Sequence, residues 1–120
     1  MYKSWIFLLS SHSLFAVTTF HVTIPTDYNP GSSGTRDSAT SGDLRYCLNA
    51  MNETLNTGPD DCQILFDYPM NIQLNGILPI VNNSSNPVNI TIGNSDPSFT
   101  VTIDGNGGSY RGFFIPHSLS

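Results

Sequence analysis

The sequence predicts a mostly β protein in which one amphipathic helix precedes a series of short strands. Three observations support this fold class. Charged residues make up only 11% of the 120 residues, and the uncharged polar residues that replace them are typical of β-structure with many tight turns. One segment, 44–55, has the apolar period of a helix. Short strand-like segments then recur between turn residues, which favours the coils of a parallel β-helix over a sandwich or barrel.

Residues 1–18 are expected to form a signal peptide. Lys3 places a positive charge before two apolar segments, 5–9 and 14–17, and small residues near Ala16 suit cleavage. The polar interruption at 10–13 excludes a transmembrane helix, which needs about 20 nearly unbroken apolar residues. The alternative is a buried first strand or helix of a cytosolic protein. Export would place the chain at the cell surface, in the outer membrane or outside the cell.

Residues 19–62 are expected to form an N-terminal cap of strand, loop and helix. The segment 20–24 alternates apolar and polar residues and ends at Pro25, as a strand does. The segment 27–42 is rich in Gly, Ser, Asn and Asp, which predicts a loop. Thr40 and Asp43 have the spacing of a capping box, with Ser41 as an alternative N-cap. The helix stops at 56–59, and its core face consists of Leu44, Leu48, Met51 and Leu55.

The two cysteines, Cys47 and Cys62, are expected to form a disulfide if the chain is exported. Such a bridge would contribute about 3 kcal/mol by closing a loop of about 15 residues. The alternative is a pair of buried, reduced thiols that pack as small apolar groups. A zinc site is not expected, because two cysteines without a paired histidine supply too few ligands.

Residues 63–120 are expected to form the first coils of an incomplete solenoid. Turn residues separate six strand candidates, and two of these, 89–93 and 100–105, are near copies of one another. The six candidates are 64–66, 71–74, 78–81, 88–92, 99–103 and 112–115.

The order of these segments over residues 20–116 resembles the N-terminal capping region of bacterial β-helix surface proteins. That group includes autotransporter passengers, polymorphic outer-membrane proteins and filamentous adhesins. Its helix begins with the pattern G-S-L-R-x-A-I, which Gly42, Leu44 and Arg45 match while Asp43 replaces the serine. The resemblance implies a right-handed parallel β-helix whose cap helix covers the first coils. It also implies a non-catalytic adhesin or passenger fragment rather than an enzyme.

The members of that group continue for hundreds of residues, so the chain is expected to be truncated or to be continued elsewhere. Its partners would then be the missing downstream coils, or a second copy bound through the open C-terminal edge. The alternative function is the start of a β-helix polysaccharide lyase or hydrolase. A host surface or glycan ligand is not specified by any motif. Nucleic-acid binding is disfavoured because the four basic residues are scattered.

No residue pattern predicts a catalytic, cofactor or metal site. No nucleophile has a motif that pairs it with His21, so this residue is expected to be an ordinary surface histidine. Asp60 and Asp61 are adjacent carboxylates after a helix end, whereas acid and base pairs come from facing elements. The segment 104–108 lacks the downstream Glu of an EF-hand and is expected to be a turn.

Overall fold

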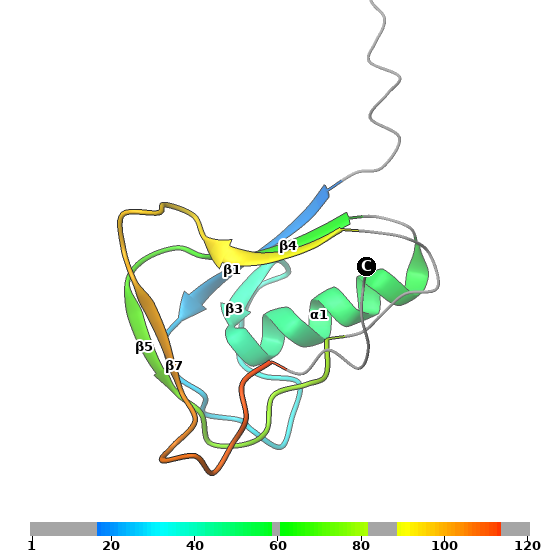
Figure 1. Ribbon diagram of the computed structural model, residues 1–120. Helices are drawn as coiled ribbons and strands as arrows, with labels where there is room; N and C mark the ends of the chain where they lie inside the picture. The colour runs from blue at the N-terminus through cyan, green and yellow to red at the C-terminus, as the bar shows by residue number, and fades with distance from the viewer. Residues whose placement is uncertain (1–16, 59–60, 82–88, 114–120) are drawn as a thin grey trace, which may run out of the picture.

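The computed structural model describes residues 17–58, 61–81 and 89–113. Within these ranges the chain is mostly strands with a single helix, so the predicted mostly β class is confirmed (Figure 1). The elements are β1 (Val17–Ile24), β2 (Arg36–Ser38), β3 (Ser41–Asp43), α1 (Leu44–Thr57), β4 (Asp61–Phe66), β5 (Met70–Gln73), β6 (Ile90–Asn94) and β7 (Val101–Asp104).

The larger sheet has the strand order β2-β3-β1-β4-β6 and is mixed. Its three central ladders, β3 with β1, β1 with β4 and β4 with β6, are all parallel. In register, Phe20 lies beside Ile64, and Ile64 lies beside Ile92. Residues of the same face therefore form rows across the strands.

A second sheet has two strands, which also pair in parallel and in register. β5 and β7 are parallel, with Ile72 beside Ile103, and the Leu74 amide extends the ladder by donating to the Asp104 carbonyl at 2.8 Å. In Figure 1 this pair runs at an angle to β4 and β6. The unit β4–β5 is thus followed along the chain by the unit β6–β7, and each strand of the second unit pairs in parallel with its counterpart in the first.

β2 and β3 lie within the segment expected to be a loop. β3 pairs with β1 in parallel and β2 pairs with β3 in antiparallel fashion. The adjoining backbone holds these short polar strands in place, because the His21 amide donates to the Thr40 carbonyl at 2.8 Å and the Asp43 amide to the Thr35 carbonyl at 2.9 Å. Three polar residues have little strand propensity of their own, so β3 depends on its pairing with β1, and β2 depends on its pairing with β3.

Helix α1 packs against β1, β3 and β4 and buries one side of its surface in the core. Its N-cap is Asp43, not Thr40 or Ser41, because a β-strand occupies 41–43 and Asp43 Oδ1 accepts the Tyr46 amide at 2.8 Å. The inward residues of the sheets complete the core, which includes Phe20, Val22, Cys62, Ile64, Phe66, Ile72 and Leu74.

Most expected strands form with boundaries shifted by a few residues, and three segments differ further. Residues 78–81 form no strand, although Leu78 and Val81 are buried in the core, because this apolar segment packs without a ladder. β1 begins at Val17, so two residues of the expected signal segment pair with β4. The rest of that segment, 1–16, lies outside the described residues, as do 114–115 of the last strand candidate. Gly112 and Phe113 form no strand.

The described helix, α1, is not long and apolar enough to cross a membrane.

Candidate functional site

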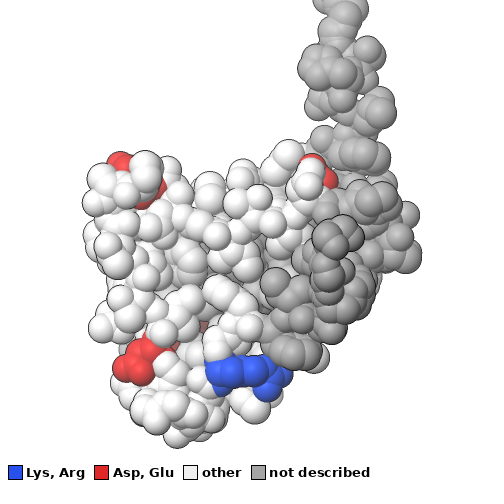
Figure 2. All heavy atoms as spheres, in the orientation of Figure 1, with Lys and Arg blue, Asp and Glu red and all other residues white. Residues whose placement is uncertain are grey.

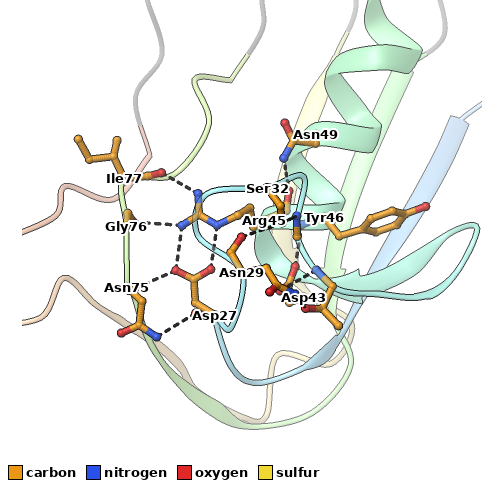
Figure 3. A network of polar contacts seen from close by, with 12 residues as sticks. Asp27, Asn29, Ser32, Asp43, Arg45, Tyr46, Asn49, Asn75, Gly76 and Ile77 are labelled. Carbon is orange, nitrogen blue, oxygen red and sulfur yellow. Dashed lines mark hydrogen bonds and ion pairs between the residues drawn. The ribbon is translucent and has the colours of Figure 1, made fainter.

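A buried ion pair joins the helix to the loop that follows β1. Arg45 and Asp27 each expose 3% of their side chains, and they meet in a two-pronged contact with Nε–Oδ1 and Nη2–Oδ2 distances of 2.8 Å (Figure 3). A guanidinium and a carboxylate match in this geometry, which is the strongest form of the pair. The Arg45 position of the helix-start motif therefore has a structural partner far away in sequence.

The same pair also holds the loop after β5. Arg45 Nη1 donates to the Ile77 carbonyl at 2.7 Å and Nη2 to the Gly76 carbonyl at 3.1 Å. The Asn75 amide donates to Asp27 Oδ2 and its side chain to the Asp27 carbonyl, both at 2.8 Å. This polar network, Asp27, Arg45, Asn75, Gly76 and Ile77, ties together three segments of the chain. Gly76 leaves room for Pro30, whose Cβ would lie 2.6 Å from an added side-chain carbon.

The charges of the network stabilise each other. Burial alone would raise the pKa of Asp27, but the hydrogen bonds from Arg45 and Asn75 and the Arg45 charge outweigh it, so this pKa lies below 3.8. The hydrogen bond to Asp27 raises the pKa of Arg45. Both groups therefore stay ionised near neutral pH, as a buried pair with complete hydrogen bonding requires.

Asp43 is a second buried carboxylate at the start of the helix. Besides capping Tyr46, it accepts the Thr35 amide on Oδ2 at 3.0 Å. Burial raises the pKa of Asp43, and these two hydrogen bonds only partly offset it. Sequence analysis did not identify these contacts, since Asp27 with Arg45 and Asp43 with Thr35 join residues of the helix start to loop residues that no periodicity reveals.

The four residues predicted as the core face of the helix all lie in the core: Leu44, Leu48, Met51 and Leu55 are each at most 1% exposed. They lie in one cluster with Ile64 and Phe66 of β4, with Ile72 of β5 and with Leu74, which follows β5. This row of apolar contacts holds α1 across the strands.

The expected disulfide is not formed in the structure, where Cys47 and Cys62 are buried thiols. The register explains why. Cys62 lies beside Thr18, whereas the Cys47 thiol donates to the His21 carbonyl at 3.3 Å. His21 is three residues further along β1, and at about 3.3 Å per residue this separation exceeds the reach of a disulfide.

The remaining chemical candidates lie on the surface or outside the described residues. His21 Nδ1 and Asp67 Oδ1 are 2.8 Å apart on an exposed face. Asp61 accepts hydrogen bonds from the amide and side chain of Asn89, while Asp60 is not described. After β7, Asn106, Gly107 and Gly108 take positive φ angles in a turn. Within the described ranges no three His, Cys, Asp or Glu side chains gather as metal ligands would.

The site with the clearest capacity for an interaction is the outer edge of β6. The Cys62 amide donates to the Asn89 carbonyl at 3.0 Å, and the Ser95 amide donates to the Phe66 carbonyl at 2.9 Å. Odd-numbered residues thus direct their backbone groups toward β4. Because these groups alternate along a strand, the N–H and C=O of Ile90 and Ile92 point the opposite way. No described strand pairs with that edge.

Half-buried apolar side chains line the same end of the molecule. The inward residues of β4 and β5 are at most 8% exposed, whereas their register partners in β6 and β7 remain partly exposed. These partly buried residues are Ile90, Ile92, Val101 and Ile103, with Phe99 and Tyr110 beside them. Figure 2 shows this side, where β6 lies in front of β4, and the charged side chains of the described residues are few and peripheral.

The opposite edge of the larger sheet is formed by β2, which is short and charged. β2 has only three residues, all exposed, and two of them, Arg36 and Asp37, are charged. Short charged strands of this type discourage pairing with another chain. One edge of the sheet is therefore protected, and the other presents backbone groups that no described strand pairs, beside apolar side chains.

Over the described ranges, the fold and this site define a mostly β protein with one helix and two sheets, in which every ladder except that of β2 with β3 is parallel. Searches against protein-family models, curated proteins and solved structures give no match for the chain.

Proposed function

We propose that the chain is the non-catalytic N-terminal cap and first coils of an exported parallel β-helix protein. The observation that carries this proposal is the in-register parallel stacking of β6 on β4 and of β7 on β5. A solenoid coil buries its inward side chains only against its neighbours. The partial exposure of the last inward residues is what a coil without a following neighbour would have.

The cap role is supported by the other end of the stack. Helix α1 covers the inward side chains of β1 and β4, and the short charged strand β2 occupies the sheet edge. The buried polar network fixes α1 to the loops after β1 and β5. Terminal capping units of solenoids have these two tasks: they cover the first coil and make its end soluble.

The location and the partner of the chain belong to the same proposal. The apolar N-terminal segment and the resemblance to bacterial surface proteins support export and a place at the cell surface or outside the cell. Further β-helix coils are the proposed partner of β6 and β7, because they would pair with the backbone of both strands and cover their half-buried side chains.

The test is to supply one more coil. A copy of residues 89–120 is fused after Ser120 of the full chain, and the free energy of unfolding is measured in urea. We expect a gain of about 3 kcal/mol, because a stacked coil buries several half-exposed aliphatic side chains. Residues 90–94 should also gain protection from amide exchange.

The matched control carries the same fused copy with serine at its four inward positions, written Ile90→Ser, Ile92→Ser, Val101→Ser and Ile103→Ser within the copy. This variant has the same added length and should leave the original stability within about 0.5 kcal/mol. Equal stabilities for the two fusions would contradict the cap proposal.

A further inference from the structure

We propose that, in the absence of a further coil, two copies of this chain bind each other through β6, in antiparallel fashion and with Thr91 opposite Thr91. The proposal rests on the proposed function, since it concerns the same open edge. It commits to a second copy as the occupant of that edge and to one register.

The backbone of β6 is suited to self-pairing. Ile90 and Ile92 direct their N–H and C=O groups to the outer edge, as the bonds of Asn89 and Ser95 to β4 require. A two-fold rotation about Thr91 places Ile90 of one copy opposite Ile92 of the other. Each such pair exchanges two backbone hydrogen bonds, so the edge groups that no described strand pairs become satisfied.

The side chains select this register. Residues opposite each other in a ladder share a face, so Ile90 and Ile92 of the two copies meet on the inward face, where both are half-buried. Two threonines meet on the outer face, which is a favourable cross-strand pair. A rotation about Ile92 would instead place Ile90 opposite the polar Asn94.

Charge does not oppose the contact. The segment 89–94 contains no charged residue, and the nearest carboxylate, Asp61, is hydrogen-bonded to Asn89 of its own chain. No like charges would therefore face each other within the paired segments themselves. The other open strand, β7, has four residues against five in β6 and ends in Asp104, so β6 is the better edge for two like copies.

Disulfide trapping in the full chain tests the register. In the proposed dimer the two Thr91 residues form a non-hydrogen-bonded pair, with Cα atoms about 4.5 Å apart, within the range of a disulfide. Thr91→Cys should therefore give a covalent dimer in a glutathione buffer, measured by non-reducing mass spectrometry. The natural Cys47 and Cys62 are buried and present in every variant.

Gly93→Cys is the matched control, since it lies on the same strand and face and an added Cβ there meets no atom within 4 Å. Its two copies would lie about 13 Å apart in the proposed register, beyond disulfide reach. Thr102→Cys on β7 is the second control. We expect Thr91→Cys to cross-link at least about tenfold faster than either, because the pair is pre-formed.

Equal rates for all three variants, or a monomeric Thr91→Cys protein, would overturn the dimer. A second readout uses the unsubstituted chain: the amides of Ile90 and Ile92 should gain protection from exchange as concentration rises, while those of Thr91 and Gly93 stay constant. Failure here leaves the fused-coil result unchanged, whereas failure of the fused coil to stabilise contradicts the cap proposal itself.

Discussion

At the residue scale, the Asp27–Arg45 pair joins helix α1 to two loops of the chain. It is the one ion pair between acidic and basic side chains in the described ranges that is fully buried, and it reaches three loop and helix segments. Such a pair contributes little compared with an apolar replacement, but removal of one partner leaves an uncompensated charge in the core.

Replacement of Arg45 by methionine should therefore lower the free energy of unfolding by about 3–5 kcal/mol, because Asp27 loses its counter-charge while remaining buried. Urea denaturation at neutral pH measures the loss. Arg36→Met, at an exposed position of β2, serves as the control and should change stability by less than about 0.5 kcal/mol. A loss for Arg45→Met as small as that for Arg36→Met would mean that the polar network does not stabilise the fold.

The pH dependence of the free energy of unfolding, compared between the unsubstituted chain and Arg45→Met, separates the contribution of Asp27 from that of the other carboxylates. Its pKa is lowered in the folded state, so the stability it contributes is complete above its ordinary value of 3.8 and is lost as pH falls through the lower folded value. Asp43 acts in the opposite sense, since its raised pKa makes acidification favourable to folding. Both the unsubstituted chain and Arg45→Met contain Asp43.

The stability difference between these two proteins should thus shrink as pH falls from 7 to 3. Without Arg45, burial raises the pKa of Asp27 above 3.8, so protonation relieves the variant of its uncompensated charge at a pH where the pair of the unsubstituted chain is still ionised. Urea unfolding in buffers across this range measures the difference. A difference that stays the same at pH 3 would show that Asp27 does not act through its charge.

At the element scale, α1 was predictable and the short strands were not. Leu44, Leu48, Met51 and Leu55 repeat with the helical period, and that pattern survives in the structure because one side of the helix meets the sheets. β2 and β3 carry no such pattern: the backbone of β1 holds β3, and β3 in turn holds β2. The segment 78–81 has a strand-like composition but packs as a buried loop.

Truncation of the helix face tests the role of α1. Met51→Ala should cost about 2–5 kcal/mol, because the side chain is fully buried and its removal leaves a cavity between helix and sheets. Glu53→Ala, on the exposed side of the same helix, controls for helix propensity. Chemical denaturation with circular dichroism compares the two. A loss below about 1 kcal/mol for Met51→Ala would argue against tight packing of the helix.

At the scale of the whole molecule, the order of the segments predicted the class of fold but not the way in which its parts are joined. The expected bridge between Cys47 and Cys62 depended on their places in the sequence, whereas the register sets them beside different residues of β1. The polar network was also unpredictable, because Asp27 and Asn75 become neighbours only when the chain is folded. Periodic apolar residues therefore predicted which side chains form the core, whereas isolated polar residues did not predict their hydrogen-bond partners.

The two thiols give a measure of cooperativity. Burial raises the pKa of Cys47 to about 12, with a contribution from the nearby Asp43 charge, so its thiolate is rare at pH 8. Cys62 is equally inaccessible in β4. Alkylation across a urea series, analysed by mass spectrometry, should modify both sites together at the unfolding midpoint. Earlier modification of Cys47 alone would indicate that the helix detaches before the sheets unfold.

The antiparallel strand β2 gives the stack a polarity. Because β2 occupies one edge of the larger sheet, any further strand of the proposed stack would join beside β6, the edge formed by residues that leave the ribosome later. Synthesis delivers the N-terminal segment first, so the closed end is complete before any later coil arrives. Each later coil would then pair with strands that are already folded. The slow formation of the first long-range parallel contacts would therefore occur once, within the first hundred or so residues to be translated.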